Sequence, residues 1–177
     1  MSQLDNIKKV IADKFIALDQ KKLLEDKVPD GSHSIIMERN ILSEKGIDYV
    51  LYRFDPDKDG DIFPFFERTT GLKMICDYIL IVEIKEKIYC LLIELKSGIS
   101  SYAKKQLEAS SIFMNYILNS AERIGCKIEN HQIRKIRISG IKSKGKRATK
   151  PKELEYDKDS YAEYNITGDF RMRPLLK

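Results

Sequence analysis

The spacing of apolar residues changes several times along the chain, and each spacing predicts a different element. In residues 3–25, Leu4, Ile7, Ile11 and Phe15 recur at helical spacing between charged residues, which is typical of an amphipathic helix. In residues 72–96 the apolar residues form two short continuous runs, which favour buried strands. The whole pattern predicts helices over residues 3–25 and 32–45, strands over 47–54, 72–83 and 88–96, a helix over 102–119 and a strand over 133–141.

This order of elements predicts an α/β domain built on a mixed β-sheet flanked by helices, with an extra N-terminal helix. A length of 177 residues suits a single domain. We expect its core over residues 32–141, followed by a basic segment and tail over residues 142–177. The apolar fraction of 42% is high enough for a folded core and argues against disorder.

Composition also limits the compartment in which we expect the protein. No apolar run approaches the roughly 18–20 residues that a membrane span needs, and the polar start has no signal-peptide pattern. Three cysteines without a CxxC pair argue against a disulfide framework and a zinc ribbon. We therefore expect a cytoplasmic protein with no membrane partner.

Positive charge is concentrated in one stretch. The chain has a net charge of +5, but residues 134–152 hold nine basic residues and no acidic one, so the rest of the chain is at −4. A local basic stripe favours a polyanion as partner. The alternative is a solvated lysine-rich loop.

Three charged residues interrupt the two apolar runs: Asp77 in the first, and Glu94 and Lys96 in the second. A charge inside a buried strand is costly unless it is paired or binds an ion. Because side chains alternate along a strand, Glu94 and Lys96 share one face. If residues 84–87 close a hairpin, opposing residue numbers add to 171, as 77 and 94 do, so Asp77 faces Glu94.

Two opposed carboxylates repel each other unless a cation lies between them. An oxygen-rich site of this kind favours Mg²⁺ or Mn²⁺. Lys96 would then place an ammonium group beside the metal, where it could position or deprotonate a water molecule or offset charge on a phosphate. The alternative is an ordinary salt bridge between Lys96 and one of the carboxylates.

The combination of Asp77, a following strand and the tripeptide Glu94-Leu95-Lys96 resembles the PD-(D/E)xK nuclease superfamily, which includes many restriction-type endonucleases. The resemblance covers residues 32–141. It implies a restriction endonuclease-like core in the order αβββαβ. It also implies a metal held by the two carboxylates and the backbone carbonyl of Leu95, with Lys96 acting on the attacking water. Cys76 precedes the aspartate, where that motif often has proline.

Residues on the two flanking helices extend this resemblance. Gln106 lies at the edge of the apolar face of the predicted helix, and branches of the superfamily carry a glutamine near the metal. Some of those branches have a tyrosine four residues later, where this chain has Ser110. Glu38 lies in the middle of the apolar side of the predicted second helix, so we expect it to be a further metal ligand, with an ion pair to an arginine as the alternative. Whether His33 takes part stays open.

Residues 55–62 match the first eight positions of an EF-hand calcium loop, but the match then fails. Position twelve is Phe66 instead of glutamate, and we favour an acidic turn after a strand. The three nearby phenylalanines, Phe63, Phe65 and Phe66, are expected in the core, with a lid or a dimer contact as alternatives.

These observations predict a metal-dependent nuclease with DNA as the expected polymer. The alternatives are a catalytically silent binding module on the same fold and an RNA-directed nuclease. The chain leaves no room for a separate recognition domain, so a homodimer or a partner subunit is a further expectation. The basic segment is expected to contact the nucleic-acid backbone. Its candidate residues are Lys142, Lys144, Lys146, Arg147 and Lys150.

Overall fold

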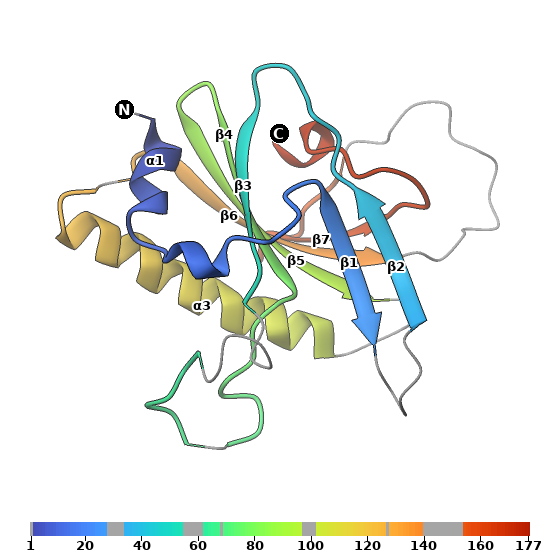
Figure 1. Cartoon of the computed structure of the whole chain (residues 1–177), viewed down its shortest axis with the longest axis horizontal. Helices are drawn as coiled ribbons and strands as arrows, with labels where there is room; N and C mark the ends of the chain where they lie inside the picture. Colours follow the sequence, from blue (N-terminus) through green and yellow to red (C-terminus); the bar gives the residue numbers. More distant parts are fainter. Residues whose placement is uncertain are drawn as a thin grey trace.

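The computed structural model of the chain (Figure 1) describes residues 2–27, 34–54, 62–67, 69–96, 102–126, 128–139 and 154–177. Its centre is a five-stranded sheet in the order β3-β4-β5-β6-β7. The first three strands are antiparallel, whereas β6 is parallel to both β5 and β7. The strands are β3 Asp48–Tyr52, β4 Tyr78–Ile84, β5 Lys87–Lys96, β6 His131–Ser139 and β7 Tyr161–Asn165.

The long helix α3 (Tyr102–Arg123) makes the crossover between the parallel strands β5 and β6, a connection that parallel pairing requires. The short helix α1 (Gln3–Lys8) packs with α3 against the same face of the sheet. Buried side chains such as Leu107 and Met114 on α3 meet alternate residues of the central strands there. We call this face the α3 face.

A second, two-stranded sheet and the C-terminal segment cover the opposite face. β1 (Lys22–Lys27) and β2 (Ser34–Asn40) pair antiparallel, and Figure 1 shows them on the side of the central sheet away from α3. Leu23 and Met37 from this pair are buried in the same core cluster as Phe170 near the C-terminal end. The sheet is therefore a middle layer with apolar contacts on both faces.

One predicted helix was too long and another was wrong. In residues 3–25 the helix α1 ends at Lys8, and the 3₁₀ turn η1 (Asp13–Phe15) and the start of β1 follow it. Most of residues 32–45 that the structure describes belong to β2 or to irregular backbone. The apolar residues of both segments fit a helical spacing, but pairing between the two strands satisfies their backbone hydrogen bonds instead.

The tail, for which the sequence pattern gave no clear structure, adds a strand and closes the core. β7 extends the central sheet, and the 3₁₀ turn η2 (Arg173–Leu175) follows it. Met172, Leu175 and Leu176 are buried against the face that also carries β1 and β2. Core side chains thus come from both sides of the expected core boundaries, 32 and 141. In the described part of the chain, no helix is long and apolar enough to cross a membrane.

Candidate active site

The β4–β5 hairpin has the strand register that the sequence predicted. Tyr78 pairs with Ile93 and Ile84 with Lys87, so opposing residue numbers add to 171 along the whole hairpin. The turn is tighter than expected, because only Lys85 and Glu86 lie outside the pairing. Both adopt left-handed backbone, with φ of 50° and 61°, as the favoured two-residue hairpin turn requires.

This register brings Asp77 and Glu94 together at the end of the hairpin. Asp77 immediately precedes β4, and its N–H donates to Glu94 Oε2 over 3.2 Å. The N–H of Leu95 donates to Asp77 Oδ2 over 2.7 Å. Each carboxylate is therefore anchored on the backbone of the opposite strand. Glu94 lies on the α3 face in line with Cys90 and Leu92, and its side chain is completely buried.

Lys96 lies on the same face as Glu94, two residues further along β5. Its Nζ is 2.6 Å from Glu94 Oε1. The salt bridge that was one alternative for the site is therefore present. Asp77 adds a second, partly buried carboxylate at the same corner.

The pKa values of the pair reflect this crowding. Burial first, and the charge of Asp77 second, raise the pKa of Glu94 to about 7, against the opposing effect of Lys96. Burial lowers the pKa of Lys96, but the hydrogen bond and the charge of Glu94 outweigh that effect and the net shift is upward. Lys96 is thus held as an ammonium ion, which suits it to neutralise negative charge more than to accept a proton.

The chemistry of these groups fits a hard divalent cation. Two carboxylates on one face provide the oxygen ligands that Mg²⁺ and Mn²⁺ prefer, and Mg²⁺ commonly keeps several water ligands beside one or two protein carboxylates. In antiparallel pairing a residue directs its N–H and its C=O toward the same neighbour. Since the N–H of Leu95 points to Asp77, its carbonyl faces the same side. No group of three or more His, Cys, Asp or Glu side chains that could hold a metal was found among the described residues.

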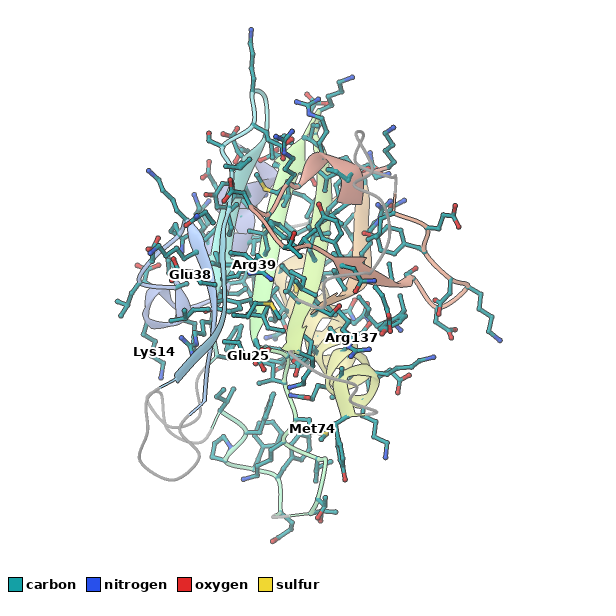
Figure 2. The ribbon with its side chains drawn as sticks, turned by 90° about the vertical axis from the view of Figure 1, so that its right-hand side faces the viewer. Lys14, Glu25, Glu38, Arg39, Met74 and Arg137 are labelled. Carbon is teal, nitrogen blue, oxygen red and sulfur yellow. The ribbon has the colours of Figure 1, made fainter. Side chains whose placement is uncertain are left out.

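Glu38 lies away from this corner. It was chosen for its position on a predicted helix, and that helix does not form. It lies on a strand, β2, and alternates with the buried Met37, so it points away from the central sheet. Its side chain is 40% exposed and forms an ion pair of 3.1 Å with Lys22. In Figure 2, Glu38 lies on the outer side of the β1–β2 pair.

Glu25 is the acidic residue that the sequence interpretation missed. It lies on β1, is only 6% exposed, and faces the central sheet (Figure 2). Its charge contributes to the raised pKa of Lys96, which places it in the electrostatic environment of the site. A period-two interpretation of residues 22–27 would have put Leu23 and Glu25 on one buried face. The helical interpretation hid this pattern.

Gln106 and Asp77 line one pocket of about 310 Å³. The pocket lies between the first turns of α3, the end of β3 and the segment that leads into β4. Gln106 Nε2 approaches the carbonyl of Ile75 at 3.5 Å. The other lining residues are Arg53, Phe54, Lys73, Met74, Ile75 and Cys76. Arg53 and Lys73 are basic residues at the site that the sequence did not single out.

Ser110 has a structural role beside this pocket. It is completely buried. Its hydroxyl donates to the carbonyl of Gln106 over 2.8 Å and accepts the N–H of Cys76 over 2.7 Å. It thereby fixes the backbone that enters β4 one residue before Asp77.

Part of the basic stretch turns out to be internal. Arg134 is buried and donates to the carbonyls of Leu175 and Lys177. Arg137 pairs with Glu163 on β7 at 2.9 Å. These two arginines therefore do not belong to an exposed basic surface that could bind a polyanion.

The other predicted basic residues, Lys142 to Lys150, lie outside the described residues. The same holds for His33 and for residues 55–61 of the calcium-like loop.

Comparisons with known proteins leave the site to be interpreted from its own geometry. No protein-family model matches the chain, and neither a curated protein nor a solved structure matches it.

Proposed function

We propose that the protein is a metal-dependent nuclease that hydrolyses phosphodiester bonds, with DNA as the expected polymer. The observation that carries the proposal is the contact between Asp77 and Glu94 at a buried hairpin end, with Lys96 2.6 Å from the glutamate. Two carboxylates and an ammonium ion in one corner match what a divalent ion and a phosphate would need.

The fold is compatible with this proposal. Among the described residues, the helix expected to open the αβββαβ core over residues 32–45 is absent, but with the β1–β2 pair set aside α1 takes its place in the order α1, β3, β4, β5, α3, β6. Asp77 stands just before the second of these strands and Glu94 near the end of the third, as the PD-(D/E)xK resemblance implies.

Each site residue would have its own role in the proposed hydrolysis. Asp77, Glu94 and the Leu95 carbonyl would hold the ion, which when bound supplies Lewis-acid stabilisation of charge on the phosphate. The Lys96 ammonium would neutralise developing negative charge and orient the attacking water. Gln106 would contact the nucleotide beside the scissile bond, since it lines the same pocket as Asp77.

The test is incubation of the full chain with plasmid, linear duplex and single-stranded DNA and with RNA, in Mg²⁺, Mn²⁺ or EDTA. We expect cleavage that requires the divalent ion. Lys96→Ala, purified in parallel, should lose about 10²-fold or more in rate, because it removes a charge aimed at the phosphate. Equal cleavage by the wild type and Lys96→Ala would point to a contaminating nuclease and would remove Lys96 from the mechanism.

A catalytically silent binding module remains the second candidate, because the Glu94–Lys96 ion pair can satisfy both groups without a metal. Besides cleavage, the effect of metal on thermal stability distinguishes the two candidates. A nuclease of the proposed type gains thermal stability from Mg²⁺ or Mn²⁺, whereas a silent module that has lost metal binding does not.

A further inference from the structure

The pocket beside Asp77 has the chemistry of a nucleotide-binding site. Its volume of about 310 Å³ falls at the lower end of the range for small-molecule sites. Arg53 and Lys73 bring positive charge to its wall, Phe54 brings an aromatic ring, and Gln106 brings an amide. Asp77 also lines the pocket, so the lining holds two cationic side chains and one carboxylate, and this balance together with one aromatic ring favours an anionic ligand that also has a flat face.

A cluster of phenylalanine rings connects this pocket to the surface. Phe54 meets Phe113 edge to face, with ring centroids 5.2 Å apart, and Phe113 meets Phe63 in the same way at 5.3 Å. Phe63 then contacts Phe66 at 5.9 Å, and Phe66 contacts Phe65 at 4.5 Å. The rings thus lead step by step from the pocket to the outside of the molecule.

The outer end of this cluster is unusually exposed. Phe63 is buried, but Phe65 is 76% exposed and Phe66 is 37% exposed, so the expectation that all three belong to the core was wrong for these two. Residues 62–67, which include both rings, lie beyond the end of the central strands, below Met74 in Figure 2. Phe65 and Phe66 lie against each other, and their exposed rings offer flat apolar faces on which a planar ligand can stack.

We infer that these two features form one binding site for unpaired nucleotides of a single-stranded nucleic acid. Arg53 and Lys73 contact a backbone phosphate next to Asp77, and the Phe65–Phe66 pair stacks on bases. The inference rests on the proposed function, because it assigns a substrate class to the same site.

Single strands fit this surface better than a duplex does. In a duplex the faces of the bases are covered by their neighbours, whereas an unpaired base offers a free face to an aromatic ring. Proteins that bind single strands without strong sequence preference generally combine aromatic rings, on which the bases stack, with a positively charged surface that contacts the backbone. Charge complementarity favours this ligand over an apolar protein surface, which would offer no anion to the wall formed by Arg53 and Lys73.

The test measures binding of the full chain to fluorescently labelled oligonucleotides in EDTA, so that cleavage plays no part. The probes are a single strand, the matching duplex, and that duplex with a single-stranded overhang. Phe65→Leu keeps apolar area but removes the ring, and Phe65→Tyr keeps the ring. Ile124→Leu is the control, because Ile124 is an exposed apolar residue just past the far end of α3.

We expect the wild type to bind the single strand and the overhang more tightly than the blunt duplex. Phe65→Leu should weaken single-strand binding about tenfold, in the range expected for losing one stacked base, whereas Phe65→Tyr and Ile124→Leu should not. Lys73→Gln should weaken binding and lower the slope of log affinity against log salt by about 0.7, because one phosphate of the single strand is no longer neutralised.

Tighter binding to the blunt duplex, or unchanged affinity in Phe65→Leu, would overturn the inference. So would a concentration-dependent dimer that Phe65→Leu dissociates, since the rings would then be an interface between protein chains. Failure of the proposed function shows itself separately, as absence of cleavage of every substrate with Mg²⁺ or Mn²⁺. Single-strand binding that depends on Phe65 could survive that result.

Discussion

Glu94 is the residue at which burial and charge conflict most clearly. Its carboxylate is fully buried, and Asp77 lies against it. Burial and this second carboxylate raise the pKa of Glu94 to about 7. The Lys96 ammonium lies 2.6 Å from Glu94 Oε1, and the basic residues Arg53 and Lys73 line the same pocket as Asp77. Two acidic groups in contact at one buried place are the physical basis for the proposed metal.

Asp77→Asn should therefore have opposite effects with and without metal. The amide keeps an oxygen that can accept the Leu95 N–H, but it removes one of the repelling charges. We expect the metal-free variant to have a melting temperature equal to or above that of the wild type. In Mg²⁺ or Mn²⁺ the wild type should gain stability, by about 2.7 kcal/mol at a hundred times the dissociation constant. The variant should lose most of this gain.

Thermal melting in EDTA and across a metal titration provides the measurement. Glu129→Gln is the matched control, because Glu129 is an exposed acidic residue before β6, at the opposite end of the sheet from Glu94. It should keep the wild-type response to metal. A full metal-induced shift in Asp77→Asn would show that the two carboxylates do not form one shared site.

Which site residues could be predicted depended on whether a regular element links them. Asp77 and Glu94 are linked by one hairpin whose register follows from a short turn, so their apposition could be derived from residue numbers. Glu25 and Arg53 come from other segments, which only tertiary packing brings near the site, and Lys73 is joined to Asp77 by irregular backbone with no period from which to place its side chain. No local pattern in the sequence records such packing.

Among the elements, those with a strong local pattern were predicted closely. The strand expected over 88–96 is β5 at Lys87–Lys96, and the helix expected over 102–119 is α3 at Tyr102–Arg123. The predicted secondary structure was wrong at the β1–β2 pair, where the mixture of apolar and charged residues fits the period of a helix and that of a strand equally well. There the packing of Leu23 and Met37 against the central sheet decides the structure.

The packing of the α3 face makes a prediction about its cysteines. Burial, as the main cause, raises the pKa of both Cys76 and Cys90 to about 12. The thiolate is the reactive form, so a raised pKa lowers reactivity at any given pH below it. At pH 8 we expect a thiol reagent to label only the partly exposed Cys126 in the native protein, and all three cysteines after unfolding.

Counting labelled thiols by mass spectrometry tests this element. Cys126→Ser is the control, and it should leave no rapidly labelled thiol in the folded protein. Fast labelling of Cys76 or Cys90 under native conditions would mean that β4, β5 and α3 do not pack as described.

At the scale of the whole molecule, one arginine of the central sheet contributes to holding the C-terminal segment in place. Arg134 lies on β6 and donates to the carbonyls of Leu175 and Lys177. Its guanidinium also lies 4.8 Å from the ring of Tyr89 and 4.6 Å from that of Tyr156. Arg134 was counted at first among the basic residues expected to bind a polyanion, but its contacts give it a structural role.

Arg134→Met should lower the free energy of unfolding by about 1–3 kcal/mol. The change keeps much of the apolar stem but removes the charged donor to the carbonyls of Leu175 and Lys177, and the Leu175 carbonyl keeps a hydrogen bond of 3.1 Å from the Tyr156 hydroxyl. Urea denaturation measures the effect, with Lys158→Met as an exposed control. An effect no larger than that of the control would show that the other contacts of the C-terminal segment, which include the N–H bonds of Met172 and Arg173 to Glu44, hold it without Arg134.

With Arg134 and Arg137 engaged inside the fold, the contribution of the basic stretch to polyanion binding depends on the basic residues beyond β6, which lie outside the described part of the chain. Replacing Lys142, Lys144, Lys146 and Arg147 with alanine removes four positive charges. We expect weaker nucleic-acid binding with little change in sequence preference, because phosphate contacts carry no sequence information. The slope of log affinity against log salt should fall by up to about 0.9 for each duplex phosphate that is no longer neutralised. Binding titrations at several salt concentrations measure both effects, and the cleavage rate at saturating substrate should change far less than in Lys96→Ala. An unchanged affinity and slope would identify the segment as a solvated loop.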